Sequence, residues 1–215
     1  MRHFGKRYAK EGRNISDAVL NDVEFDGEKV VNLKTKEEIT RKEIGNKVMC
    51  SSNAPLSATE AFSSPVSPPP FMVGIAEVEI DKETGVVEPI DYAAVVDCGT
   101  VVNPNLARVQ TEGGIAQGIG MALYEDIIYS EKGKNYSNSF MQYKIPSRLD
   151  VGEIRVEFES SYEPTGPFGA KSIGEIVINT PSPAISNAVQ NAVGVIVREL
   201  PITAEKVYKG MAEKE

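Results

Sequence analysis

The chain is organised around the stretch Gly166-Pro-Phe-Gly-Ala-Lys-Ser-Ile-Gly-Glu175, which an amphipathic, helix-like run from Asn179 to Gly194 follows directly. Glycines at this density let the backbone adopt positive φ angles and approach another group closely. A lone carboxylate between such a loop and a helix can be held at a fixed point in a crevice. The pattern therefore indicates that Glu175 is a catalytic base and that the loop before it forms a wall of an active site.

Composition and charge exclude several other classes of protein. The chain has 215 residues, enough for one large domain or two small ones, with a net charge of −8 and a pI of about 4.9. This acidic balance argues against a nucleic acid as the main partner. No apolar run approaches the roughly 18–20 residues of a membrane span, so no membrane partner is expected. The N-terminal residues lack the apolar core of a secretory signal, which favours a cytoplasmic location.

The few cysteines and histidines limit the chemistry further. Cys50 and Cys98 are isolated, so they cannot hold an iron–sulfur cluster or a structural zinc by themselves, and no residue is predicted to bind a metal directly. His3 is the single histidine, which makes a Ser-His-Asp or Cys-His mechanism within this chain untenable. Acid–base chemistry must therefore fall to Glu, Asp, Lys or Tyr.

The sequence predicts three segments. Residues 1–50 read as an N-terminal part of the same unit, with a helix over 1–22, a hairpin around Asp26-Gly27 and a short charged helix over 36–44 closed by Gly45. Residues 51–70 are rich in proline and serine. They could be a linker, but their apolar side chains favour an ordered extended segment. Residues 71–215 form the main C-terminal domain.

This C-terminal domain is expected to be α+β, with mixed sheets, hairpins and a few packed helices. Alternating apolar residues predict strands over 73–80, 86–97 and 154–159, strand-loop-strand character over 125–136 and extended segments over 140–146 and 195–203. Helices are expected over 105–124 with Asn103 as N-cap, over 181–194 ending at Gly194, and over 204–208.

The helix over 105–124 carries an unusual number of glycines, at positions 113, 114, 118 and 120. Each costs about 0.5–1 kcal/mol relative to alanine, so close backbone approach must compensate. One interpretation is tight packing of the helix against its neighbours. The other is a large ligand lying against the helix, with Gln117 as its hydrogen-bonding group.

Four motifs together resemble one known family. They are Ala76-Glu-Val-Glu-Ile-Asp-Lys-Glu-Thr-Gly85, Val95-Val-Asp-Cys-Gly-Thr-Val-Val-Asn-Pro104, Glu112-Gly-Gly-Ile-Ala-Gln-Gly-Ile-Gly-Met-Ala-Leu-Tyr-Glu125 with Tyr143-Lys-Ile-Pro146, and Gly169-Ala-Lys-Ser-Ile-Gly-Glu175. Over residues 20–209 the chain looks like the C-terminal part of the molybdenum-binding (molybdopterin) subunit of the xanthine dehydrogenase and aldehyde oxidase family, the molybdenum hydroxylases.

The resemblance implies a fold like the C-terminal molybdenum-binding domain of that family, and a reaction. The family hydroxylates an N-heterocycle, such as a purine, or an aldehyde with oxygen from water. Glu175 would be the general base that deprotonates a molybdenum-bound hydroxyl. Gln117, Gly118 and Gly174 would contact the molybdopterin cofactor, while Lys171 and Ser172 would support the loop. The resemblance leaves open whether the cofactor carries a cytosine dinucleotide.

The chain departs from the family in length, because the upstream half of the molybdenum subunit has no counterpart here. The resemblance therefore implies a split subunit whose cofactor is shared with a partner polypeptide, together with iron–sulfur and FAD subunits that take the electrons. Two alternatives stay open. The chain could be a non-catalytic assembly or interaction subunit that kept the fold, or it could be a gene fragment.

Overall fold

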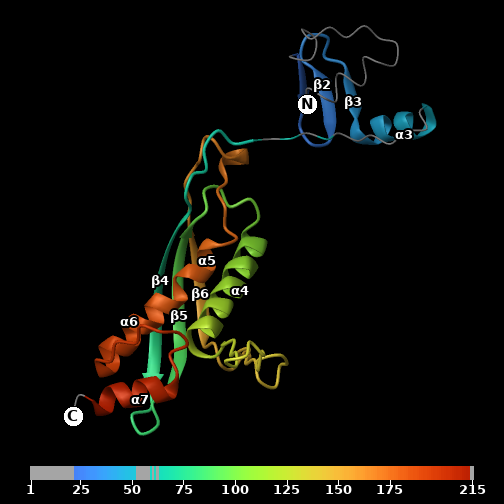
Figure 1. The fold of residues 1–215 in the computed structure, drawn as a ribbon. Coiled ribbons are helices and arrows are strands. Elements are labelled where there is room, and N and C mark those ends of the chain that lie inside the picture. The colour runs from blue at the N-terminus through green and yellow to red at the C-terminus, as the bar shows by residue number, and fades with distance from the viewer. Residues whose placement is uncertain (1–21, 52–58, 60, 62, 214–215) are drawn as a thin grey trace. The chain divides into compact units, whose positions relative to one another are not determined.

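The computed structural model describes residues 22–51, 59, 61 and 63–213 (Figure 1). The chain divides into two compact units, one up to Ser63 and the other from Ser64. Ser64 begins the second unit, and its hydroxyl donates hydrogen bonds to the carbonyls of Val66 and Thr165. The predicted helix over 1–22 lies outside the described residues except for its last position, and the segment boundaries at 50 and 70 stay a prediction.

The first unit is a small antiparallel sheet followed by a helix. Its elements are β1 Val23–Phe25, β2 Lys29–Asn32, β3 Glu38–Thr40 and α3 Arg41–Ser51. The hairpin around Asp26-Gly27 is confirmed. The helix expected over 36–44 is wrong, because residues 38–40 pair with β2 and the helix begins only at Arg41. Thr40 and Glu43 cap that start reciprocally, and the helix continues through Gly45 instead of ending there.

The second unit is built on the three-stranded sheet β4 Phe71–Ile80, β5 Val87–Asp97 and β6 Glu153–Glu159 (Figure 1). The central strand β5 pairs antiparallel with β4, as the hairpin pattern predicts, and parallel with β6. Gly85 closes the hairpin at φ 78°. This mixed sheet confirms the α+β class.

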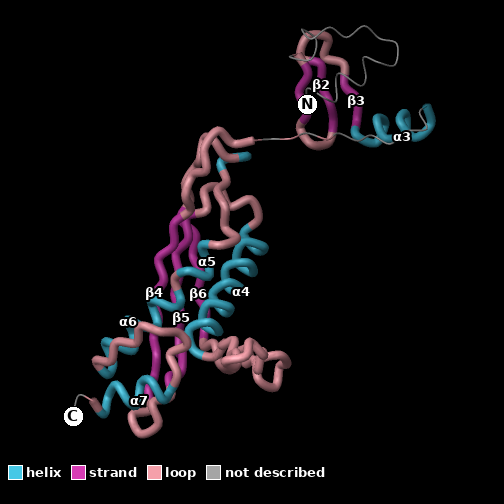
Figure 2. The backbone as a smooth tube through the Cα atoms, in the orientation of Figure 1, coloured by secondary structure: helices cyan, strands magenta, loops and turns pink. Residues whose placement is uncertain are grey.

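The described part of the second unit also holds four α-helices, α4 Pro104–Leu123, α5 Ile176–Asn179, α6 Pro181–Val193 and α7 Ala204–Ala212, and the short 3-10 helix η1 Pro167–Gly169. The predicted N-cap Asn103 accepts a hydrogen bond from the Leu106 amide, and Gly194 ends α6 in the left-handed conformation. α4 and α6 lie over the same face of the sheet (Figure 2). The core forms between them from Tyr92, Ala94, Val96, Val156, Ile115, Ile119, Ile185 and Val189.

Three predicted extended segments form no strands. Residues 125–136 make only an isolated bridge between Tyr129 and Asn135. Residues 140–146 start with a turn, in which the Ser139 carbonyl accepts hydrogen bonds from the amides of Gln142 and Tyr143. In the segment 195–203, the Ile202 amide donates to the Ala122 carbonyl at the end of α4 instead of pairing with a strand.

Some glycines of α4 allow close packing against neighbouring elements, whereas Gly113 has no such packing role among the described residues. A Cβ at Gly114 would lie 2.2 Å from Cγ2 of Val177, and one at Gly118 would lie 2.5 Å from Cγ of Pro181. These two glycines therefore let α4 approach the start of α5 and α6 closely. A Cβ at Gly113 would meet nothing within 4 Å. Packing within the described chain thus gives no reason for a glycine at position 113.

The loop that precedes α5 is anchored to the end of β5. Its Gly169 carbonyl accepts a hydrogen bond of 2.8 Å from the Thr100 amide, and the Lys171 amide donates to the Cys98 carbonyl at 2.7 Å. Lys171 Nζ lies 2.6 Å from Oδ2 of Asp97, and the Lys171 side chain is only 8% exposed. This ion pair, with a hydrogen bond from Ser161, lowers the pKa of Asp97 to about 2.

Alanine substitutions at the adjacent residues Gly113 and Gly114 distinguish the effect of packing on stability from the effect of helix propensity. Gly114→Ala should lower the free energy of unfolding by about 1–3 kcal/mol, because its methyl group would overlap Val177. Gly113→Ala should raise it by about 0.5–1 kcal/mol, since alanine favours a helix and the site is open. Urea denaturation of the purified chain measures both changes. Equal changes in the two variants would contradict the packing described here.

The Asp97–Lys171 pair should make stability depend on acid pH. The folded state lowers the pKa of Asp97 from 3.8 to about 2, so its stabilisation is present above pH 4 and is lost as the pH falls through 2. We expect this one carboxylate to account for about 2 kcal/mol of the loss between pH 5 and pH 2.

The measurement is the free energy of unfolding at several pH values for the natural chain, for Asp97→Asn and for the exposed control Glu131→Gln. Asp97→Asn should be less stable at pH 5 and show a shallower pH dependence, whereas Glu131→Gln should follow the natural chain. Parallel pH profiles for all three proteins would show that the ion pair does not anchor the loop.

Candidate functional site

Glu175 lies between two fixed points. On its N-terminal side the loop is held at Lys171 by the ion pair to Asp97. On its C-terminal side Val177 is buried against Gly114 of α4. Glu175 itself occupies the N-cap position of α5 and is exposed, and it makes no side-chain capping bond. Its backbone is thus placed by packing on both sides, while its carboxylate stays available to a group outside the described residues.

Gln110 of α4 faces the same segment. Its Nε2 lies 3.5 Å from the carbonyl oxygen of Gly174, the residue before Glu175. Gly174 is exposed, and a Cβ there would meet nothing within 4 Å, as at Gly113. Two glycines without an internal packing role therefore lie near an exposed amide and an exposed carboxylate.

An exposed strip runs along α4 from this point. Gln110, Gly113 and Gln117 are spaced by three and four residues, which places them on one side of a helix, and all three are exposed. The two amides can donate and accept hydrogen bonds, and Gly113 between them leaves the backbone open to close approach. The strip can therefore hold a flat, hydrogen-bonding ligand that reaches Gly174 and Glu175 at one end.

The predicted site residues are only partly brought together. Glu175 and Gly174 lie beside Gln110, and Gln117 lies on the same strip but farther along α4. Gly118 is buried against Pro181. The group that approaches its backbone closely is therefore the Pro181 side chain of the same chain. Cofactor binding by Gln117, Gly118 and Gly174 stays a prediction.

Sequence reasoning missed Gln110, although its spacing of seven residues from Gln117 is a signal of a shared helix face. Lys171 supports the loop through its ion pair, as expected, whereas Ser172 is exposed.

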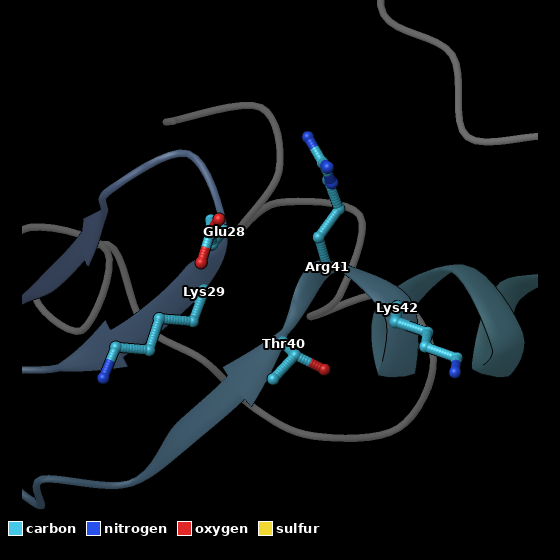
Figure 3. Close-up of a pocket in the computed structure, with 5 residues that line it drawn as sticks. All are labelled: Glu28, Lys29, Thr40, Arg41 and Lys42. Atoms are coloured by element: carbon cyan, nitrogen blue, oxygen red, sulfur yellow. The ribbon is translucent and has the colours of Figure 1, made fainter.

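Other features of the described residues offer no competing site. They contain no group of three or more His, Cys, Asp or Glu side chains that could hold a metal ion. Across the same part of the chain, no helix is long and apolar enough to span a membrane. A shallow depression in the first unit is lined by Glu28, Lys29, Thr40, Arg41 and Lys42 (Figure 3). Its charged side chains do not converge, because Lys29 pairs with Glu38 and Arg41 points away from Lys29 (Figure 3).

A family model described as the molybdopterin cofactor-binding domain matches residues 2–152 of this chain. That range includes the sheet strands β4 and β5 and all of α4, and it ends before the loop that carries Glu175.

Two curated relatives extend the comparison. Subunit gamma of the 6-hydroxypseudooxynicotine dehydrogenase complex of Paenarthrobacter nicotinovorans is 36% identical over 142 residues, which is 65% of this chain and 18% of that protein. The xanthine dehydrogenase molybdenum-binding subunit of Escherichia coli is 34% identical over 155 residues, which is 72% of this chain and 21% of that protein. The chain spans about a fifth of the length of these relatives.

A solved structure supports the same relationship. The reconstituted CO dehydrogenase from Oligotropha carboxidovorans matches 90% of this chain and 25% of its own chain, with a TM-score of 0.74 and 26% identity. The matched family model, the relatives and this structural likeness agree. The chain therefore belongs to the molybdopterin cofactor-binding domain family, in the molybdenum oxidoreductases of the xanthine dehydrogenase and aldehyde oxidase type.

Proposed function

We propose that this chain supplies the C-terminal catalytic part of a molybdenum hydroxylase, with Glu175 as general base. The observation that carries the proposal is the position of Glu175 at the end of the strip on α4, next to Gly174 and Gln110. The family relationship suggests molybdopterin as the ligand of that strip. Lys171 and Val177 would then serve to hold the base in place on either side.

The residues of the strip fit a molybdopterin. A pterin is flat and rich in hydrogen-bond donors and acceptors, and the amides of Gln110 and Gln117 offer both kinds of group. Gly113 and Gly174 leave the backbone open, so such a group can approach without meeting a side chain. We propose that Gln110, Gln117 and Gly174 contact the cofactor directly. Gly118 would act by letting α4 pack against Pro181.

Glu175 would act as a proton acceptor in this site. The bound cofactor would supply a redox-active molybdenum centre that takes two electrons from a substrate carbon, which gains an oxygen atom from water. The Glu175 carboxylate would accept the proton that is released when the oxygen nucleophile forms. General bases work best when their pKa lies near the working pH, and exclusion of water raises the pKa of a carboxyl group. Because Glu175 is exposed among the described residues, other segments of the enzyme would have to cover it.

The substrate class we propose is an N-heterocycle, such as a purine, or an aldehyde. The names of two relatives support the N-heterocycle, since one is called a xanthine dehydrogenase molybdenum-binding subunit and another belongs to a 6-hydroxypseudooxynicotine dehydrogenase complex. The aldehyde rests on the resemblance to the aldehyde oxidase branch of the family. The two electrons must leave the site, so we propose iron–sulfur and FAD subunits as partners. A cytosine dinucleotide form of the cofactor and a cytoplasmic location stay predictions.

A non-catalytic assembly subunit is the second candidate. It would keep the sheet and the α4 packing, but it would need neither an exposed Glu175 nor an open Gly113. The two experiments below separate the candidates.

Replacing the base tests catalysis. Glu175→Gln should lower turnover by roughly 10²–10⁴-fold, because a general base contributes about that much. The molybdenum and pterin contents of the purified enzyme should not change. The exposed control Glu131→Gln should keep both turnover and cofactor. The measurement is turnover on a panel of purines, other N-heterocycles and aldehydes, with metal analysis of each preparation. Undiminished turnover in Glu175→Gln would remove the catalytic assignment.

Filling the open glycine tests cofactor binding. Gly113→Leu adds a side chain on the strip, whereas Gly45→Leu adds the same side chain to a position of α3 where a Cβ likewise meets nothing within 4 Å. Both variants should fold, and only Gly113→Leu should lose most of its bound molybdopterin, measured by pterin fluorescence after release. Gln110→Ala should lower the pterin content to a smaller extent. If Gly113→Leu kept a full complement of pterin, the cofactor would not lie on this strip.

A further inference from the structure

One face of the β4–β5–β6 sheet carries a row of exposed apolar side chains. α4 and α6 cover the opposite face. On the uncovered face Phe71, Val73 and Ile75 of β4 are 62%, 65% and 67% exposed. Their register places Val73 opposite Val95 and Ile75 opposite Ala93 on β5. We call these five residues the apolar patch. Large apolar side chains that lie together at a sheet surface mark a place where another protein segment packs.

Acidic side chains border this patch. The acidic rim consists of the exposed residues Glu77 and Glu79 on β4 and Glu157 and Glu159 on β6. Glu157 lies directly opposite Val95 in the parallel pairing, and Glu159 lies opposite Asp97. The cations at this face already have partners, since Arg155 Nε donates to Oδ1 of Asp91 at 3.0 Å and Lys171 pairs with Asp97. The rim therefore keeps a net negative charge.

We propose that the apolar patch and the acidic rim dock the part of the molybdenum subunit that lies outside this chain, through an apolar surface flanked by Lys and Arg side chains. This inference rests on the proposed function. The matched relatives are about five times as long as the segment they share with this chain, so much of the subunit is available to cover the face. A second copy of this chain fits poorly, because it would bring two acidic rims together.

The patch also adjoins the anchor of the Glu175 loop. Lys171 Nζ lies 5.4 Å from the centre of the Phe71 ring, at the end of the patch where Asp97 leaves β5. A segment docked on Phe71 would cover the Asp97–Lys171 pair and shield it from water. Docking at this face and the position of the Glu175 loop would therefore be linked through Lys171.

The experiment reconstitutes the subunit from this chain and the rest of the molybdenum subunit, expressed as a separate polypeptide. Val73→Glu and Ile75→Glu should leave the circular dichroism and the melting temperature of this chain nearly unchanged, because both side chains are exposed. Each should weaken association by roughly tenfold or more, since a carboxylate would be buried in an apolar contact. The control Leu149→Glu changes a 94% exposed apolar residue outside the patch and should associate normally.

The acidic rim is tested by charge reversal. Glu157→Lys should weaken association at low ionic strength, and the difference from the natural chain should shrink at high salt. Normal association of Val73→Glu, or an equal loss in Leu149→Glu, would overturn the proposal. These readouts follow association and not turnover, so they are independent of the assignment of Glu175 as base.

Cross-linking identifies the occupant. A photoreactive maleimide on Val73→Cys, in a Cys50→Ser background because Cys50 is the exposed natural cysteine, should join this chain to the rest of the molybdenum subunit. We expect the linked segment to contain Lys or Arg next to apolar residues. A link to residues 1–63 of this chain, or to a second copy, would overturn the proposal.

Discussion

The close approach of α4 to Val177 and Pro181 is the contact on which the rest of the second unit depends. Gly114 and Gly118 have no side chains, so the start of α5 and α6 can lie directly on α4. This contact fixes the backbone just after Glu175 and places Gly174 within reach of Gln110. A larger residue at either glycine would push α5 away from α4 and would move the carboxylate with it.

Two different kinds of interaction hold the Glu175 loop, and they respond differently to conditions. The contact with α4 is apolar packing, which pH does not alter. The contact at Lys171 is an ion pair with Asp97. The pair lowers the pKa of Asp97, so this anchor weakens only when acid protonates the carboxylate. Between these anchors the loop needs few contacts of its own, which is consistent with exposed Ser172, Gly174 and Glu175. This arrangement suits the base we propose at Glu175, because a fixed backbone with a free side chain can present a carboxylate to a cofactor.

Local patterns predicted the elements that depend on local chemistry. Alternation and the Gly85 turn located β4 and β5, and Asn103 and Gly194 marked helix ends. The role of Glu175, inferred from the glycine-rich loop before it, stays a prediction. The errors arose where long-range contacts decide the outcome. Residues 38–40 look helical but pair with β2, and residues 125–136 look extended but find no partner strand beyond one bridge.

The candidate site also depends on long-range contacts that local sequence patterns do not show. The sequence pointed to Gln117 because glycines surround it, yet Gln110 is the glutamine that lies beside Gly174. The partnership of Asp97 and Lys171, which are 74 residues apart, is likewise invisible to any local pattern.

We propose that Glu175 and Gln110 face one shared cofactor, which segments outside this chain help to enclose. The decisive measurement is a structure of the assembled molybdenum enzyme. It should show the pterin along the strip of Gln110, Gly113 and Gln117, with the Glu175 carboxylate buried next to the molybdenum. A pterin bound elsewhere, or a Glu175 side chain still exposed to solvent in the complete enzyme, would contradict it.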